Sequence, residues 1–182
     1  MTRGRGVPLP LFSITKMSKR SSVMENKKVI VENLSHGRVG INVPDLRLRR
    51  VWERKGAKKP IDLHDLMEAI YDPGVEAMFK EGILGIDDME VKIALGLEPE
   101  GATEPVNTIT LTDKQRQRYL TLAPLHELKE LLPKLPKEQV LSLVDYAIEH
   151  ELTIMDRAEL LKKATGIDIV RAVQLKKQDE ED

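Results

Sequence analysis

Residues 136–173 read PKEQVLSLVDYAIEHELTIMDRAELLKKATGIDIVRAV, and apolar residues recur through this stretch at helical spacing. Apolar residues at intervals of three and four form the buried stripe of an amphipathic helix. In the first segment, 136–150, the stripe consists of Val140, Leu143, Val144, Ala147 and Ile148. The stretch therefore predicts a bundle of short helices.

Two further helices are expected in the same stretch. The second follows Thr153 and ends at Gly166, because glycine readily takes the left-handed conformation that closes a helix. Asp168 is expected to cap the third, since a carboxylate accepts a hydrogen bond from a free N–H group of the first turn. Upstream, Thr112 begins one helix and Pro124 opens another. Together these segments predict an all-α bundle of four to five short helices.

Between residues 28 and 61 the pattern changes from helix to strand. Short β-branched or alternating segments separated by turn residues predict strands. The segments are 29–31, 39–43, an alternating one that begins at Leu46, and an edge strand at 60–62. A sheet this small needs a helical cover, which residues 63–70 supply. The expected fold class is α+β, with a small antiparallel sheet and covering helices followed by the all-α bundle.

Changes in composition divide the chain into five parts. The segment from Glu98 to Pro105 contains two prolines, one glycine and three acids, a composition typical of linkers. The parts are a basic leader predicted to be disordered (1–27), a small α+β domain (28–97), a linker (98–107), the helical bundle (108–176) and an acidic tail (177–182). Translation starts at Met17 or Met24 are alternatives to Met1.

Composition excludes several classes of protein. The 182 residues are 41% hydrophobic and 32% charged, which is normal for a globular chain. The absence of cysteine excludes disulfides, thiolate zinc sites and cysteine nucleophiles. The net charge of −1 provides no general attraction to nucleic acid or membrane. No apolar run approaches the roughly 20 residues that cross a bilayer, so we expect no membrane partner.

Motifs that carry catalytic chemistry are not found in the sequence. There is no glycine-rich phosphate loop, nucleophile elbow or dinucleotide fingerprint. His64, Asp65 and Glu68 share a short segment, but no second histidine or carboxylate cluster accompanies them, so we expect no metal site. The remaining histidines are isolated, and the acids Asp87, Asp88 and Glu90 fit a helix first turn. We therefore expect no enzyme, no cofactor and no small-molecule substrate.

The strongest local charge bias lies in residues 47–59. Its basic residues are Arg47, Arg49, Arg50, Arg54, Lys55, Lys58 and Lys59. Such clusters can bind phosphate backbones, but they also form solvated faces, protect sheet edges or meet acidic proteins. If Leu46 and Leu48 face the core, alternation leaves Arg47 and Arg49 exposed together and turns Arg50 to the other face.

The order of turns and apolar positions resembles a known group of proteins. The matching features are Val31-x-Asn33-x-Ser35, Gly37-x-Val39, Pro44, Arg49-Arg50, Pro73-Gly74, Leu84-x-Ile86, Asp156-Arg-Ala-Glu, Thr165-Gly166-x-Asp168 and Ala172. This order resembles small proteins encoded by tailed phages and prophages of Gram-positive bacteria. The resemblance implies a phage gene product in the virion or the host cytoplasm, and it carries over no catalytic residues.

Two functions remain open at this point. The first is a non-enzymatic structural or protein-interaction protein associated with the virion, which binds a protein partner or itself. The alternative is an accessory nucleic-acid-binding protein that uses the basic stretch 47–59.

Overall fold

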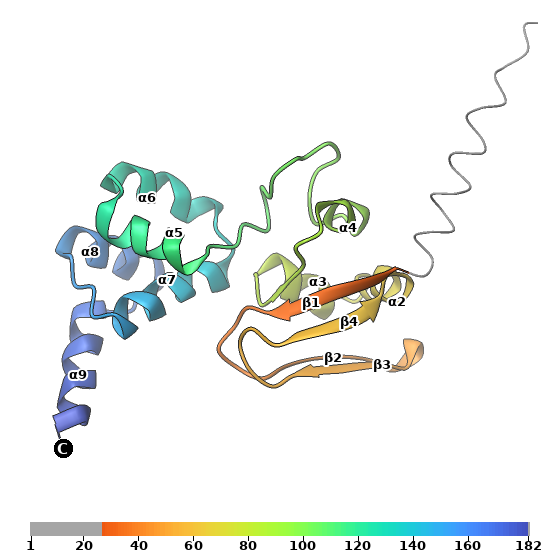
Figure 1. Ribbon diagram of the computed structural model, residues 1–182, viewed down its shortest axis with the longest axis horizontal. Coiled ribbons are helices and arrows are strands. Elements are labelled where there is room, and N and C mark those ends of the chain that lie inside the picture. The colour runs from red at the N-terminus through yellow and green to blue at the C-terminus, as the bar shows by residue number, and fades with distance from the viewer. Residues whose placement is uncertain (1–26, 182) are drawn as a thin grey trace, which may run out of the picture.

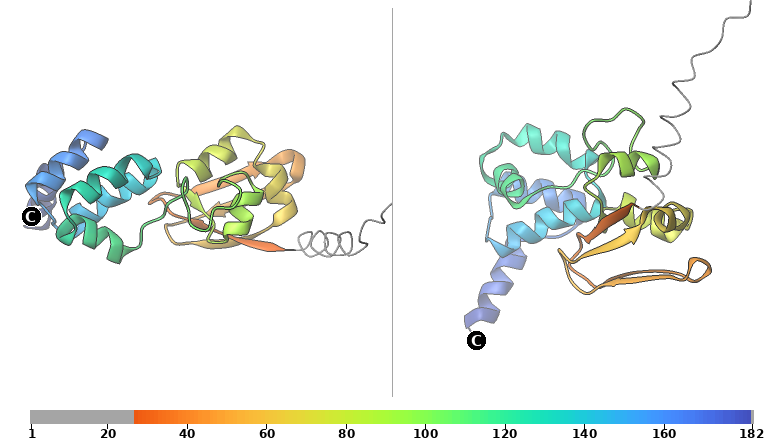
Figure 2. Two further views of the ribbon diagram at one scale, coloured as in Figure 1. Left: turned by 90° about the horizontal axis from the view of Figure 1, so that it is seen from above. Right: turned by 45° about the vertical axis from the view of Figure 1, so that its right-hand side comes forward.

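The computed structural model describes residues 27–181 and has the expected α+β architecture. Figure 1 shows a strand-rich part followed along the chain by a helical part. Viewed from above in Figure 2, the two parts lie at opposite ends of the molecule. The predicted disordered leader lies outside the described residues, apart from Lys27.

Within residues 27–181, five strands form two antiparallel sheets. In the first, β1 (Lys28–Asn33) lies between β4 (Lys58–Asp62) and the two-residue strand β5 (Leu84–Gly85). The second is a hairpin of β2 (Val39–Val43) and β3 (Leu48–Trp52). The prediction of a small antiparallel sheet is therefore confirmed. The structure divides its strands between two sheets.

The expectation that the third strand begins at Leu46 is wrong. Residues Pro44–Leu46 form a 3₁₀ turn, η1, and the strand begins at Leu48. Proline at the start of the turn has a fixed φ angle and cannot donate to a strand ladder. Arg47 closes the turn in the left-handed conformation, with φ of 50°. It therefore does not continue an alternating strand with Arg49.

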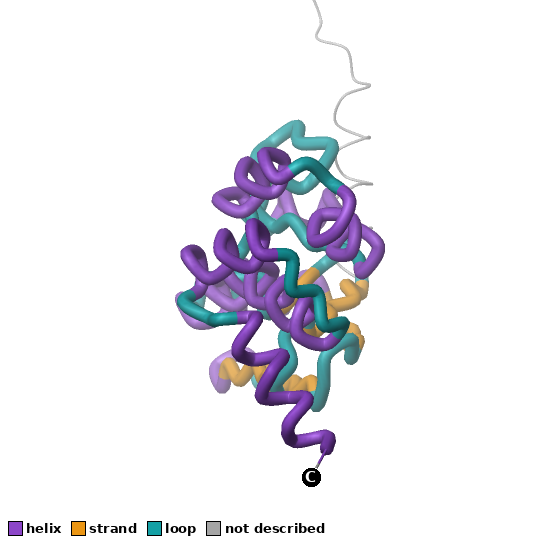
Figure 3. Tube along the Cα trace, turned by 90° about the vertical axis from the view of Figure 1, so that its left-hand side faces the viewer, coloured by secondary structure: helices purple, strands orange, loops and turns teal. Residues whose placement is uncertain are grey.

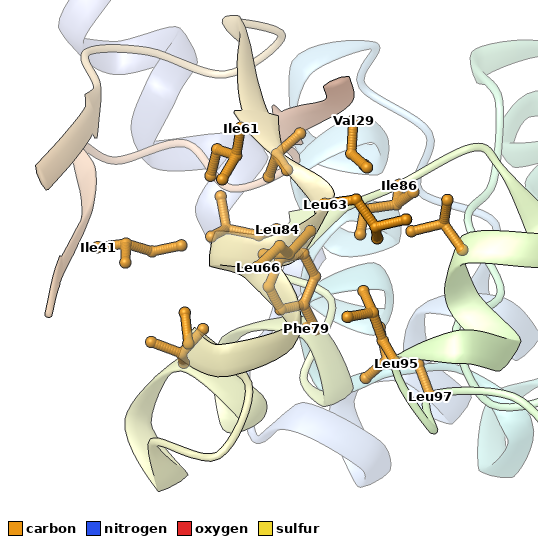
Figure 4. Close-up of a cluster of buried hydrophobic side chains, with 14 of the residues drawn as sticks. Val29, Ile41, Ile61, Leu63, Leu66, Phe79, Leu84, Ile86, Leu95 and Leu97 are labelled. Carbon is orange, nitrogen blue, oxygen red and sulfur yellow. The ribbon is translucent and has the colours of Figure 1, made fainter. Parts of the chain in front are cut away.

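Three short helices cover the core of the strand-rich part. They are α2 (Leu63–Ala69), α3 (Pro73–Lys80) and α4 (Met89–Ala94). Figure 4 shows Leu66, Phe79 and Leu84 packed together in this core. The fully buried Trp52 fixes the hairpin against the first sheet, because its indole N–H donates a 2.9 Å hydrogen bond to the carbonyl oxygen of Val31.

As far as the chain is described, the helical part contains five α-helices, one π-helical turn and one 3₁₀ turn. These elements are α5 (Asp113–Gln117), the π-helical turn η2 (Arg118–Leu122), α6 (Leu125–Leu131), the 3₁₀ turn η3 (Leu132–Lys134), α7 (Lys137–Glu149), α8 (Met155–Thr165) and α9 (Ile169–Glu181). Figure 3 views this helical part end-on, with the strands behind it.

The predicted helix ends are confirmed in this part. Thr112 caps α5 with a reciprocal bond to Gln115, and Gly166 ends α8 with φ of 79°. The carboxylate of Asp168 accepts a 3.1 Å hydrogen bond from the backbone N–H of Arg171. The last helix continues to Glu181, so most of the expected acidic tail is helical. No helix within residues 27–181 is long and apolar enough to cross a membrane.

Candidate functional site

The seven basic residues of the stretch 47–59 are distributed over three structural elements. Arg47 follows η1, at one end of the β2–β3 hairpin. Arg49 and Arg50 belong to β3 and lie on its opposite faces, Arg49 exposed and Arg50 half-buried. Arg54 and Lys55 follow β3 at the other end, about 17 Å away for a strand of this length. Lys58 and Lys59 belong to β4.

Lys58 is already paired within the first sheet. Its Nζ lies 3.1 Å from Oε2 of Glu32, the residue directly opposite on β1. This contact raises the pKa of Lys58 through the hydrogen bond and charge of Glu32. No carboxylate among residues 27–181 forms an ion pair with Arg47, Arg49 or Arg54. These three arginines therefore form the part of the stretch that is available to an external anion.

Lys55 connects the basic stretch to the helical part. Its half-buried Nζ donates a 3.1 Å hydrogen bond to Oγ of Ser142 in the middle of α7. The same Nζ lies 3.0 Å from Nε2 of His36. His36 in turn lies 3.1 Å from a carboxylate oxygen of Asp145, also on α7. The two turns of the strand-rich part, around His36 and Lys55, are thus attached to one face of α7.

A cleft of about 550 Å³ lies between the two parts of the chain beside this contact. The strand-rich part contributes Glu32, Lys55 and Asp87, and the segment that enters α5 contributes Thr110, Thr112 and Arg116. Both kinds of charge therefore line the cleft, with Lys55 and Arg116 as its cations.

Arg116 is the most unusual charged residue of the cleft. Its side chain is only 9% exposed, and its single ion pair is a 2.6 Å contact of Nη1 with Asp113, whose side chain is 77% exposed. Its Nε is buried and has no hydrogen-bond partner in the described part of the protein. Leaving a buried donor without a partner costs free energy, commonly about 1–3 kcal/mol.

The electrostatics of the junction follow from burial and crowding. Burial lowers the pKa of Lys55, and the positive charge of Arg116 lowers it further, against the opposing effect of Asp145. Burial likewise raises the pKa of Glu138, and the nearby charge of Asp145 acts in the same direction. Both shifts disfavour charge at the junction, as expected where ionisable groups lose contact with water.

The residues that we considered for metal binding lie apart from this cleft. Nδ1 of His64 lies 3.9 Å from its neighbour Asp65. Over the described range, 27–181, no three histidine or acidic side chains come together as a possible metal site. Asp88 caps α4, as the sequence predicted, by accepting a 3.2 Å hydrogen bond from the N–H of Val91.

Sequence reasoning missed Arg116 and its place in the cleft. The sequence predicted only that a helix begins at Thr112, without a role for Arg116. A signal was nevertheless present, because Arg116 precedes the buried Leu120 by four residues and therefore shares its face. A charged residue on an apolar stripe is a reason to look for a partner group. The proximity of Lys55 to α7, in contrast, has no local sequence signal.

Comparison with protein-family models, with curated proteins and with solved structures finds no match to this chain.

Proposed function

We propose that the protein has a non-enzymatic protein-interaction function and contacts its partner through the end of the helical part where α8 begins. The observation that carries this proposal is a group of exposed large apolar side chains. Leu122 is 80% exposed, Met155 is 60% exposed and Ile154, beside it, is 40% exposed. Grouped apolar exposure of this kind is typical of protein-binding surfaces. We call these three residues the α8 surface.

Arg157 joins the two segments that carry these three residues. Its Nε donates a 3.0 Å hydrogen bond to the carbonyl oxygen of Tyr119, and its Nη2 donates to that of Ala123. These bonds fix the turn that carries Leu122 against the first turn of α8, which carries Met155. The two segments that carry the apolar surface are therefore held together by hydrogen bonds.

A shallow groove of about 490 Å³ continues from the α8 surface between α8 and α9. Met155, Ala158 and Val170 line this groove together with charged residues, among them Lys162, Asp168 and Arg171. Protein interfaces combine apolar contacts with polar ones. The groove enlarges the contact area that a partner protein can use.

The resemblance to small proteins of tailed phages supports a partner in the phage particle. We therefore propose a virion-associated structural role, in which the α8 surface contacts another virion protein or a second copy of this chain. The test is the mass spectrum of purified particles produced with the wild-type chain or with the double variant Leu122→Asp/Met155→Asp. We expect the particles to contain the wild-type chain. We expect the double variant to be strongly depleted from them.

The matched control is Tyr71→Asp, which places the same charge on an 83% exposed aromatic residue of the strand-rich part. This variant is expected in particles at the wild-type level. Absence of the wild-type chain from particles, or equal incorporation of both variants, would contradict the proposal. Light scattering of the purified chain then separates self-association from binding to another protein.

A second candidate function is nucleic-acid binding by the basic stretch. The observation that favours it is the exposure of Arg47, Arg49 and Arg54 without carboxylate partners in the part of the chain that the structure describes. Exposed arginines of this kind can neutralise backbone phosphates.

A further inference from the structure

We propose that the cleft between the two parts binds a small phosphate ester, whose phosphate group is held by Lys55 and Arg116. This cleft is separate from the α8 surface. Lys55 and Arg116 line it together although they lie 61 positions apart in the chain. An oxyanion between two cations accepts charge-assisted hydrogen bonds from both.

Three acids, Glu32, Asp87 and Asp113, line the cleft together with these cations, and Glu32 is paired with Lys58 outside it. Asp145, which faces Lys55, is engaged with His36 at 3.1 Å. Asp113 contacts only Nη1 of Arg116 and is largely exposed to water, which weakens the pair. Nε of Arg116 remains without a partner among residues 27–181. Because this Nε is itself buried, the anion would meet the remaining exposed part of the Arg116 side chain, which lines the cleft.

Lys55 is positioned for the same anion. Its contacts with Ser142 and His36 restrain the ammonium group at the edge of the cleft, so less side-chain freedom is lost on binding. Burial lowers the pKa of Lys55, and the positive charge of Arg116 lowers it further. A bound dianion would offset the repulsion between Lys55 and Arg116, because its negative charge lies beside both cations.

The remainder of the cleft defines the rest of the ligand. A volume of about 550 Å³ lies in the range of small-molecule sites and exceeds what one phosphate ion fills. Thr110, in the segment before α5, also lines the cleft. Asp87, on the opposite wall, is exposed and makes no hydrogen bond or ion pair within the described residues. Its carboxylate can accept hydrogen bonds from hydroxyl or amino groups of the ligand.

The ligand class is thus a phosphate ester that also carries hydrogen-bond donors. A nucleoside monophosphate and a sugar phosphate are the two sources of this chemistry. Calorimetric titration of the purified full chain with adenosine monophosphate, glucose 6-phosphate, inorganic phosphate, adenosine and glucose separates them. We expect saturable binding of at least one phosphate ester and none of adenosine or glucose. Binding of only one ester identifies its source, and either result supports the proposal.

The variant test uses Lys55→Gln against Lys59→Gln. Lys59 is half-buried on the neighbouring strand β4 and does not line the cleft, so it is a matched control. We expect Lys55→Gln to weaken binding about tenfold, the usual effect of losing one charge-assisted hydrogen bond, and Lys59→Gln to bind as the wild type does.

A second variant, Arg116→Lys, retains the charge and removes the planar fork, and we expect it also to bind about tenfold more weakly. Circular dichroism of each variant checks that the chain is folded. Amide NMR spectra of the wild-type chain locate the binding site without any substitution. The amide signals of Gly56 and Thr110, which line the cleft, should shift when the ligand is added. Failure of every phosphate ester to bind at millimolar concentration, wild-type affinity in Lys55→Gln, or shifts confined to residues outside the cleft would overturn the proposal.

Discussion

The backbone N–H group of Glu138 donates a 3.0 Å hydrogen bond to the carbonyl oxygen of Glu81, and this bond joins the first turn of α7 to the end of α3. First-turn N–H groups of a helix have no partner within the helix, so the strand-rich part supplies one. The next residue, Gly82, adopts φ of 76°, and a Cβ atom added there would lie 2.9 Å from Cβ of Pro136. The two parts therefore approach closely at a glycine.

Replacing Gly82 with alanine should destabilise the protein and loosen this contact. A left-handed φ angle costs a residue with a Cβ atom about 1 kcal/mol, and the approach of Pro136 adds a steric cost. The matched control is Gly96→Ala, because Gly96 has φ of 71° but no atom within 4 Å of the added Cβ. Urea unfolding followed by circular dichroism should show the larger loss for Gly82→Ala. Equal losses would mean that the contact with Pro136 contributes nothing.

Glu98 should hold the segment 99–108 against the end of the strand-rich part. Its buried carboxylate accepts hydrogen bonds from the backbone N–H groups of Val106, Asn107 and Thr108, at 2.7 to 3.2 Å. We expect Glu98→Gln to lower the free energy of unfolding by about 1–3 kcal/mol, because an amide nitrogen would face these donors. Brief proteolysis should then cut within 99–105 faster than in the wild type. Unchanged cleavage would show that the carboxylate does not restrain this segment.

The same residue predicts a dependence of stability on pH. Burial alone would raise the pKa of Glu98, but the hydrogen bonds from Thr108, Asn107 and Val106 outweigh it and hold the pKa below its ordinary value. The stabilisation is therefore present above the unfolded pKa of about 4.3 and is lost as the pH falls through the folded pKa. Thermal midpoints of wild type and Glu98→Gln should converge on acidification. Parallel curves from pH 7 to pH 3 would argue against this linkage.

Leu143 tests the central helix. The side chain is fully buried in α7, so Leu143→Ala should cost about 2–5 kcal/mol through lost burial and the remaining cavity. The control is Leu175→Ala in α9, where the leucine is 52% exposed and the expected change is under about 0.5 kcal/mol. Denaturant unfolding of both variants gives the comparison. An unchanged midpoint for Leu143→Ala would mean that the wrong face of α7 has been assigned to the core.

The prediction that Leu143 is buried is confirmed, whereas the prediction that Arg47 lies in a strand is wrong. The two outcomes have different physical reasons. Helical periodicity is a local property, so the buried face of α7 and its neighbouring caps could be inferred from spacing alone. The alternating pattern after Pro44 does not distinguish a strand from a 3₁₀ turn followed by a strand, and Pro44 favours the turn because it cannot donate to a strand ladder. The cleft brings together residues such as Lys55 and Arg116, which lie 61 positions apart. No periodicity encodes such an arrangement, so the candidate site could be only partly anticipated, through Lys55.

Arg47 and Arg49 give the test that separates the two candidate functions. Both side chains are exposed, so the double variant Arg47→Glu/Arg49→Glu should remain folded, with a change in stability under about 0.5 kcal/mol per site. If the stretch binds nucleic acid, affinity should fall steeply with salt, since each neutralised phosphate adds about 0.9 to the log–log slope on duplex DNA. Fluorescence anisotropy with duplex and single-stranded DNA and RNA, at low and at physiological salt, measures this slope.

The charge-matched control is Lys114→Glu/Lys129→Glu, which changes two exposed lysines of the helical part by the same amount. Under the protein-interaction proposal, binding at physiological salt should be weaker than micromolar, and the two double variants should reduce residual low-salt binding alike. Because Arg49 and Arg50 lie on opposite faces of β3 and Lys58 is paired with Glu32, only part of the basic stretch can face one duplex at a time. Micromolar or tighter binding at physiological salt that is lost in Arg47→Glu/Arg49→Glu and retained in the control would favour nucleic-acid binding over the α8 surface as the main function.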